Sequence, residues 1–131
     1  MIREAQYSDL PYFYKAAKEF IDLTPFSLDV ESYLNNIIQL MESESAGIFT
    51  NGSAHCAVIL IPSLYDSNET IARVISTWGA GGLKCFDAAV KWAKENSADI
   101  LIADSYVEPR MESFYKRFGM VQTDKVYLRK I

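Results

Sequence analysis

The chain has few residues that form disulfides or bind metals, and few that break helices and strands. Its 131 residues include 2 cysteines, 1 histidine, 6 glycines and 4 prolines. Cys56 and Cys85 show no CxxC spacing and have no histidine at ligand spacing, which argues against a zinc site and favours two buried, reduced thiols. No acidic triplet resembles a cation loop either. We therefore expect no bound metal.

Basic residues are not in excess, and long apolar runs are missing. Lys and Arg number 13 against 17 Asp and Glu, a formal net charge of −4 that argues against a nucleic-acid-binding surface. No apolar run approaches the length of a membrane span, and Met1 to Gln6 lacks the features of a signal peptide. The sequence predicts one globular domain over residues 1–131, in the cytoplasm, without a membrane or nucleic-acid partner.

Helical periodicity dominates the first third of the chain. Ser8-Asp9 can cap a helix over residues 10–21, and Pro25 prevents its continuation. A second helix is predicted to start near Ser27 or Asp29, because apolar residues recur there at helical spacing. It ends in a polar run of Glu and Ser residues, after which the periodicity becomes that of strands.

Strands and helices alternate in the rest of the chain. Residues 46–50 and 55–62 flank Asn51-Gly52, a dipeptide typical of tight hairpin turns, so we predict an antiparallel hairpin. His55 flanks this turn, where a surface position is expected, although its side chain could act as a base near neutral pH. The other predicted elements are a strand at 69–77, a helix at 83–96, a central parallel strand at 99–103 and a helix at 110–118 ending at Gly119. Residues 120–131 alternate and are predicted to form one strand or a closing hairpin.

A glycine-rich turn, Trp78-Gly79-Ala80-Gly81-Gly82, joins one of these strands to the helix that follows. Its backbone N–H groups can approach an anion closely, and the helix N-terminus adds a partial positive charge. The turn therefore predicts a phosphate site or, alternatively, close packing of the helix on the sheet. Asp104, roughly twenty residues later, gives the spacing of a dinucleotide fingerprint, but Lys84 occupies the third glycine position.

Two segments carry a more specific pattern. Glu69 to Asn96 combines a strand, a glycine loop and a helix, and residues 114–120 have the sequence Phe-Tyr-Lys-Arg-Phe-Gly-Met. The first resembles the elements with which the GNAT superfamily of acyl-CoA-dependent N-acyltransferases holds the coenzyme A pyrophosphate. The second is similar to that family's closing helix motif. The resemblance implies an α/β (α+β) fold, with a mixed central β-sheet flanked by helices, and acetyl transfer from acetyl-CoA to a primary amine.

The resemblance also implies roles for individual residues. Tyr115 stands where the family has the general acid that protonates the departing thiolate, and Glu69 is the best candidate for the base that deprotonates the amine. Backbone groups near Ser76 would contact the oxyanion and the pantetheine arm. The implied acetyl-CoA site comprises Ile75, Ser76, Thr77, Trp78, Gly79, Ala80, Gly81, Gly82 and Leu83, with no metal.

The acceptor is expected to be a small-molecule or peptide amine. Three acidic residues near the presumed cleft, Asp104, Glu108 and Glu112, would favour a cationic amine. The alternating segment at 125–131 could pair across a homodimer. Selection of the acceptor is assigned to the turn between the first two helices and to two tyrosines: Thr24, Pro25, Phe26, Ser27, Tyr65 and Tyr106.

A non-catalytic member of the same fold is the alternative. The family's glycine loop begins with Arg or Gln, whereas this chain has Ser76 or Trp78 there, depending on the register. The turn is also short, and Glu108 stands where the family commonly has Asn. These departures suit a binding or structural module.

Overall fold

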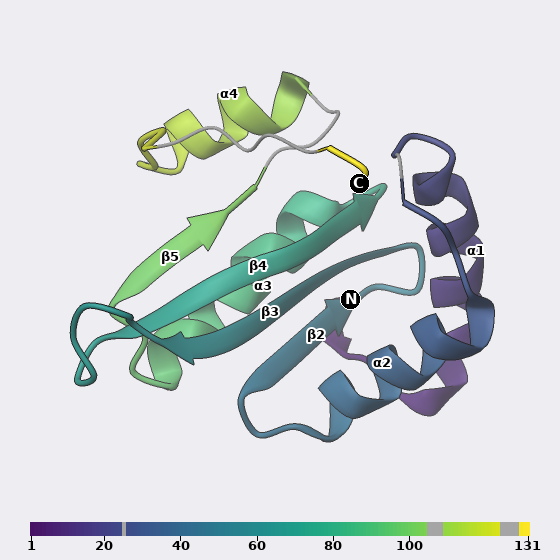
Figure 1. Ribbon diagram of the computed structural model, residues 1–131, viewed down its shortest axis with the longest axis horizontal. Coiled ribbons are helices and arrows are strands. Elements are labelled where there is room, and N and C mark those ends of the chain that lie inside the picture. The colour runs from purple at the N-terminus through teal and green to yellow at the C-terminus, as the bar shows by residue number, and fades with distance from the viewer. Residues whose placement is uncertain (25, 105–108, 124–128) are drawn as a thin grey trace.

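The fold is a mixed β-sheet between helices. The computed structural model describes residues 1–24, 26–104, 109–123 and 129–131. In these residues one sheet has the strand order β1-β2-β3-β4-β5, antiparallel except for the parallel pair of β4 and β5. Figure 1 shows α3 behind this sheet, with α1 and α2 on its other side. The predicted fold class is therefore confirmed. The elements are β1 (Arg3–Glu4), η1 (Tyr7–Asp9), α1 (Leu10–Ile21), α2 (Val30–Glu42), β2 (Ala46–Thr50), β3 (Ala54–Pro62), β4 (Thr70–Gly79), α3 (Gly82–Glu95), β5 (Ile100–Ala103) and α4 (Pro109–Arg117).

Two predicted helix boundaries follow from local capping. Asp29 precedes α2, and its Oδ1 accepts a hydrogen bond from the Ser32 amide at 2.9 Å. Gly119 follows α4 with a φ of +87°, and the amides of Gly119 and Met120 donate to the carbonyls of Lys116 and Tyr115 at 3.1 and 2.9 Å. This is a Schellman arrangement, which glycine favours because it lacks a Cβ.

Asp9 has a different role from the predicted one. Its carboxylate does not cap α1, but accepts a bidentate pair from the Arg3 guanidinium at 2.7 and 2.8 Å and a bond from the Gln6 amide at 2.8 Å. The hydrogen bonds from Arg3, above all, lower the pKa of Asp9. The side chain thus ties β1 to the start of the helical region.

The predicted antiparallel hairpin is present, and Thr50 pairs with His55 across its turn. The loop between β2 and β3 contains Asn51, Gly52 and Ser53. The Asn51 Oδ1 accepts hydrogen bonds from the amides of Ser53 and Ala54, each at 2.8 Å, which closes an Asx turn. Only Gly52 in this loop has a positive φ, of +89°.

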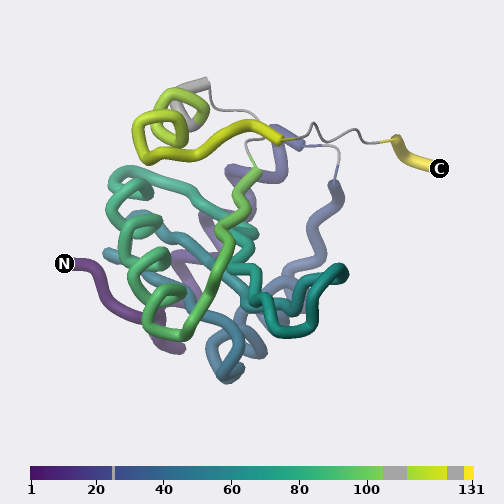
Figure 2. The backbone as a smooth tube through the Cα atoms, turned by 90° about the vertical axis from the view of Figure 1, so that its left-hand side faces the viewer, coloured from purple at the N-terminus to yellow at the C-terminus, as the bar shows by residue number. Residues whose placement is uncertain are grey.

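Two strand predictions are corrected near the end of the chain. β5 is parallel to β4 as predicted, but in the described sheet it is an edge strand, with Ile100 and Ile102 40% and 38% exposed. Residues 120–123 and 129–131 are not strand. The rest of the predicted final strand, 124–128, lies outside the described residues, and with it most of the proposed dimer segment. Figure 2 shows α4 and residues 118–123 lying across one end of the sheet, with the two chain ends on opposite sides of the molecule.

The sheet separates two hydrophobic cores. The α3 face packs residues of α3 against β3 and β4, with Phe86 at its centre. The opposite face, hereafter the α1 face, packs Phe13 and Ile37 against Ile48 and Ala57. No helix in the described part of the chain is long and apolar enough to cross a membrane.

Candidate functional site

A β-bulge interrupts the pairing of β3 and β4. Val58 pairs with Val74 and the preceding residue, Ala57, pairs with Ser76, so Ile75 is the extra residue in β4. A bulge bends its strand and leaves the extra residue without a partner in the ladder. Ile75 is accordingly exposed. This places a distortion in the middle of the segment for which backbone contacts were predicted.

β4 and β5 part at the same level of the sheet. Their parallel pairing runs from Ile71 with Ile100 to Val74 with Ala103 and goes no further. Figure 1 shows the two strands diverging towards the end of β4. Among the described residues, no strand pairs with this side of β4 beyond Val74. On this side of β4, backbone groups from Ile75 onwards therefore have no strand partner among the described residues. We call this unpaired stretch between β4 and β5 the gap, and an extended ligand could be hydrogen-bonded along it.

Tyr115 lies at the β5 side of this gap. Its hydroxyl donates a hydrogen bond to the carbonyl of Asp104, the residue after β5, at 3.1 Å. Its ring packs on Phe86, with centroids 5.6 Å apart. Burial raises the pKa of Tyr115 to about 12. At neutral pH the phenol is therefore protonated, and both neighbours fix its position.

The glycine turn starts α3 just beyond the gap. Gly79 has a φ of +92°, and a Cβ there would lie 2.4 Å from the Ser53 carbonyl oxygen. Gly81 has a φ of +90° and is the N-cap of α3. The first amide that the helix pairs is that of Lys84, with the Gly81 carbonyl at 3.0 Å. The amides of Gly82 and Leu83 precede it and have no intrahelical acceptor, which is the usual arrangement of an anion-binding helix end.

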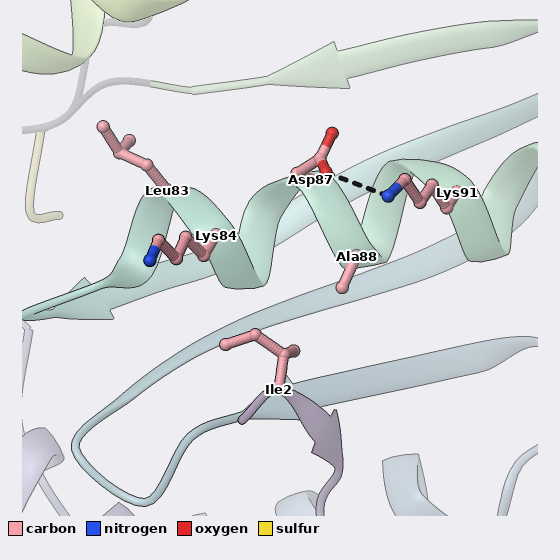
Figure 3. A pocket seen from close by; sticks show the side chains of 6 residues that line it. All are labelled: Ile2, Leu83, Lys84, Asp87, Ala88 and Lys91. Carbon is pink, nitrogen blue, oxygen red and sulfur yellow. Dashed lines mark ion pairs between the residues drawn. The ribbon is translucent and has the colours of Figure 1, made fainter.

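A shallow groove of about 410 Å³ runs along the outer surface of α3. Figure 3 shows Leu83 and Asp87 on one side of the helix, and Lys84 on the side of Ile2. Lys91 reaches back to Asp87, with Nζ and Oδ2 3.4 Å apart. Lys84 has no such ion pair among the described residues, so its ammonium stands beside the first turn of α3 as a cation that the sequence patterns did not single out.

His55 is not a surface residue, contrary to expectation. It is 3% exposed and faces α1, where its Nδ1 lies 2.9 Å from the Tyr12 hydroxyl. Its Nε2 lies 2.7 Å from the hydroxyl of Ser76, the residue after the bulge. Burial lowers the pKa of His55 to about 4, so the imidazole is neutral at pH 7. The hairpin places His55 on the same face as Ala57, two residues on, and that alternation was the signal for burial.

Glu69 and Tyr65 lie at the other end of β4. Glu69 immediately precedes the strand, and its amide bonds the Asp66 carbonyl at 3.0 Å. At about 3.3 Å per strand residue, six residues separate it from Ile75 by roughly 20 Å. Tyr65 is 94% exposed in the loop before it. The structure does not bring either residue together with Tyr115.

The α1 helix lies beside the end of β4. The ring centroids of Phe20 and Trp78 are 5.6 Å apart, and the Trp78 indole donates to the Glu19 carboxylate at 3.4 Å. The Trp78 side chain therefore faces α1, not α3. The segment between α1 and α2 lies at this same end of the molecule (Figure 1); it contains Thr24, Phe26 and Ser27, whereas Pro25 lies outside the described residues.

The three predicted acidic residues differ in their surroundings. Asp104 pairs with Arg73 of β4, with Oδ2 and Nη2 2.9 Å apart, so its charge is already countered. Glu112 is exposed on α4, and Glu108, like Tyr106, lies outside the described residues. Glu19 beside Trp78 is a further exposed carboxylate near the gap, and sequence patterns did not single it out.

The cysteines and the acidic residues form no metal centre in the described part of the chain. Cys56 and Cys85 are both free and fully buried on the α3 face. Burial raises the pKa of Cys56 to about 12, and it also raises that of Cys85. Both are therefore neutral thiols that serve as core residues, as the sequence predicted.

Comparison with known proteins identifies the fold. No family model and no curated protein matches the chain. Among solved structures, glucosamine-6-phosphate N-acetyltransferase from Arabidopsis thaliana is 16% identical with a TM-score of 0.74, covering 100% of this chain and 97% of that one. A predicted acetyltransferase from Clostridium acetobutylicum, solved with acetyl-CoA, is 15% identical with a TM-score of 0.76, covering 99% and 95%.

A third solved structure carries a different description. A transcriptional regulator from Bacillus halodurans is 17% identical with a TM-score of 0.80, covering 100% of this chain and 99% of that one. Together these likenesses show that the chain has the fold of the GNAT acetyltransferases, which confirms the resemblance at the level of the fold.

Proposed function

We propose that the chain is an acetyl-CoA-dependent N-acetyltransferase that acts on a primary amine. One observation carries the proposal: the gap between β4 and β5 has the bulge at Ile75 on one side and the Tyr115 hydroxyl on the other. The bulge borders the gap with backbone groups, and the Tyr115 hydroxyl can supply a proton. Acetyl transfer from a thioester needs both kinds of group.

The reaction places a different demand on each side of the gap. The amine nitrogen attacks the thioester carbonyl carbon, a C–N bond forms, and the carbonyl electron pair moves to oxygen. Backbone N–H groups near Ile75 would stabilise this oxyanion. When the carbonyl re-forms, the C–S bond breaks and the thiolate leaves with the bonding pair, taking the proton of Tyr115. The amine nitrogen loses its proton to solvent, and Glu69 is too distant to take part directly.

The coenzyme fits the start of α3 by charge. The amides of Gly82 and Leu83 and the ammonium of Lys84 would hold the diphosphate. One neighbour of the same fold was solved with acetyl-CoA, which supports this choice of cosubstrate. The pantetheine arm would then extend from the α3 N-terminus into the gap towards Ile75.

The acceptor that we propose is a cationic amine on a small molecule or peptide. Exposed carboxylates of Glu19 and Glu112 lie on the two helices that flank the gap. The proposal also includes a cytoplasmic location, supported by the two free thiols, and it requires neither a nucleic acid nor a membrane. Activity against polyamines and basic peptides that exceeds activity against anionic amines would support this choice.

The Tyr115→Phe variant tests the enzyme directly. The hydroxyl is lost while the ring on Phe86 remains, so we expect kcat to fall about 100-fold and the affinity for acetyl-CoA to stay within about twofold. Chromatography of released coenzyme A measures the first, and calorimetric titration with acetyl-CoA the second. Tyr14→Phe, an exposed position on α1, is the matched control and should leave both unchanged. Absence of saturable binding at millimolar acetyl-CoA would reject the enzyme and favour the non-catalytic module.

A further inference from the structure

Three side chains form a continuous hydrogen-bonded chain on the α1 face. The Tyr12 hydroxyl meets His55 Nδ1 at 2.9 Å, and His55 Nε2 meets the Ser76 hydroxyl at 2.7 Å. The rings of Tyr12 and Phe13 pack on the imidazole with centroids 5.7 and 5.1 Å away. The chain thus runs from a half-buried phenol, through a buried imidazole, to an exposed serine.

The hydrogen bonds in this chain have a defined direction. Burial raises the pKa of Tyr12, so its hydroxyl is protonated and must donate somewhere. Among the described residues, His55 Nδ1 is the acceptor within reach. A neutral imidazole that accepts at Nδ1 carries its proton on Nε2, which then donates to the Ser76 oxygen. The Ser76 proton is therefore left to point outward, away from the histidine.

Ser76 stands at the edge of the gap described above. It follows the bulged Ile75 directly, and β4 has no described partner on the β5 side at this level. Its hydroxyl lies 2.7 Å from His55 Nε2, and the residue as a whole is exposed. A hydroxyl whose oxygen accepts from His55, and whose own proton is not used by His55, is pre-organised to donate to an acceptor atom in the gap.

We infer that the Ser76 hydroxyl, oriented by Tyr12 and His55, donates a hydrogen bond to the thioester carbonyl oxygen and strengthens it as the oxyanion forms. The inference rests on the proposed acetyl transfer, and it gives the Ser76 side chain a role beside that of the backbone. Successive hydrogen bonds polarise one another, so the donation from Tyr12 strengthens that from Ser76. Tyr12 and His55 are positioning residues, because they act through Ser76.

Nuclear magnetic resonance tests the direction of the chain without any turnover. The side-chain ¹⁵N shifts of His55, the sole histidine, show which ring nitrogen carries the proton. We expect the neutral Nε2–H form in the wild-type protein at pH 7, and mixed tautomers in Tyr12→Phe, which keeps the ring but loses the donor. A wild-type imidazole protonated at Nδ1 would overturn the inference, because Ser76 would then donate inward.

Kinetics test the role of the hydroxyl. Ser76→Ala should lower kcat about 100-fold, as for the loss of one oxyanion donor, with affinity for free coenzyme A unchanged, and Ser76→Thr should restore much of the rate. Tyr12→Phe should lower kcat less than Ser76→Ala does. Ser67→Ala, in the exposed loop at the other end of β4, is the matched control.

The outcomes separate the two proposals. Full activity of Ser76→Ala in an enzyme that binds acetyl-CoA and releases coenzyme A would overturn the role of Ser76 while leaving the proposed function intact. A wild-type protein that binds no acetyl-CoA would overturn both. A lowered kcat in Ser76→Ala together with the Nε2–H tautomer would support the whole inference.

Discussion

The two faces of the β3–β4 pair are built differently. The α3 face is apolar, and its one described side-chain hydrogen bond between these strands is the weak contact from Thr77 Oγ1 to Cys56 Sγ at 3.5 Å. The α1 face buries the imidazole of His55 with polar partners on both sides. Burying a polar group is costly unless it is hydrogen-bonded. The comparison teaches that the α3 face secures the fold, whereas the α1 face retains polar groups beside the gap.

The largest expected effect comes from one phenylalanine on each face. Phe86 and Phe13 are both 0% exposed, so Phe86→Ala and Phe13→Ala should each reduce the free energy of unfolding by about 3–5 kcal/mol. Urea denaturation measures both. Only Phe13→Ala removes a ring from His55, and only Phe86→Ala removes one from Tyr115. Phe86→Ala should therefore lower kcat further than Phe13→Ala when both are compared under fully folded conditions. Equal losses of kcat would show that the two faces are not independent.

The next effect is a pH dependence of stability that belongs to the α1 face. The pKa of His55 is about 4 in the folded chain and near 6.5 ordinarily. Between these values the unfolded chain binds more protons, so stability is complete above about pH 6.5 and falls as the pH drops. The expected loss by pH 4 is about 3 kcal/mol.

Urea denaturation between pH 7.5 and 4.5 measures this dependence, with His55→Asn as the control. The variant should lose most of the slope in this range. The pKa of Asp9 is also lowered, from an ordinary value near 3.8, so its contribution is lost only at more acidic pH and does not overlap. A slope that persists in His55→Asn would mean that other groups are responsible.

The smallest expected effect is the loss of stability when one polar contact is removed from each face. Tyr12→Phe leaves the Nδ1 of a buried imidazole without its donor, which should cost about 1–2 kcal/mol. Thr77→Val removes only the contact to sulfur and should change stability by less than about 0.5 kcal/mol. Thermal unfolding of the two variants at pH 7.5 provides the measurement. The reverse order of the two losses would contradict the assignment of the polar network to the α1 face.

Most of the fold could be predicted because the signals are local. Helical spacing defined α1 and α2, and Asp29 and Gly119 marked helix ends through bonds within one turn of the chain. The edge position of β5 could not be predicted, because a run of apolar residues is similar in a central strand and in an edge strand with one exposed face. The hairpin around Asn51-Gly52 was predicted from that dipeptide, and the Asn51 side chain closes its loop through bonds to the amides of Ser53 and Ala54.

The site was harder to predict, because its key features join distant segments. The role of Tyr115 came from family resemblance and the glycine turn from its local sequence, but the bulge at Ile75 depends on how β3 and β4 are registered. The bond from Tyr115 to the Asp104 carbonyl and the contact between His55 and Ser76 likewise join different elements. No spacing within one segment encodes such contacts. Only strand alternation, which puts His55 on the side of Ala57, pointed towards one of them.

The burial of both thiols between α3 and the sheet has a practical consequence. Cys56 and Cys85 are each 0% exposed. A disulfide reagent that releases a coloured thiolate on reaction with free coenzyme A should therefore leave the native protein unlabelled. The same reagent will reach both sulfurs once α3 lifts from the sheet. The same colour reaction can therefore measure two rates: turnover when substrate is present, and the rate at which α3 separates from the sheet when substrate is withheld.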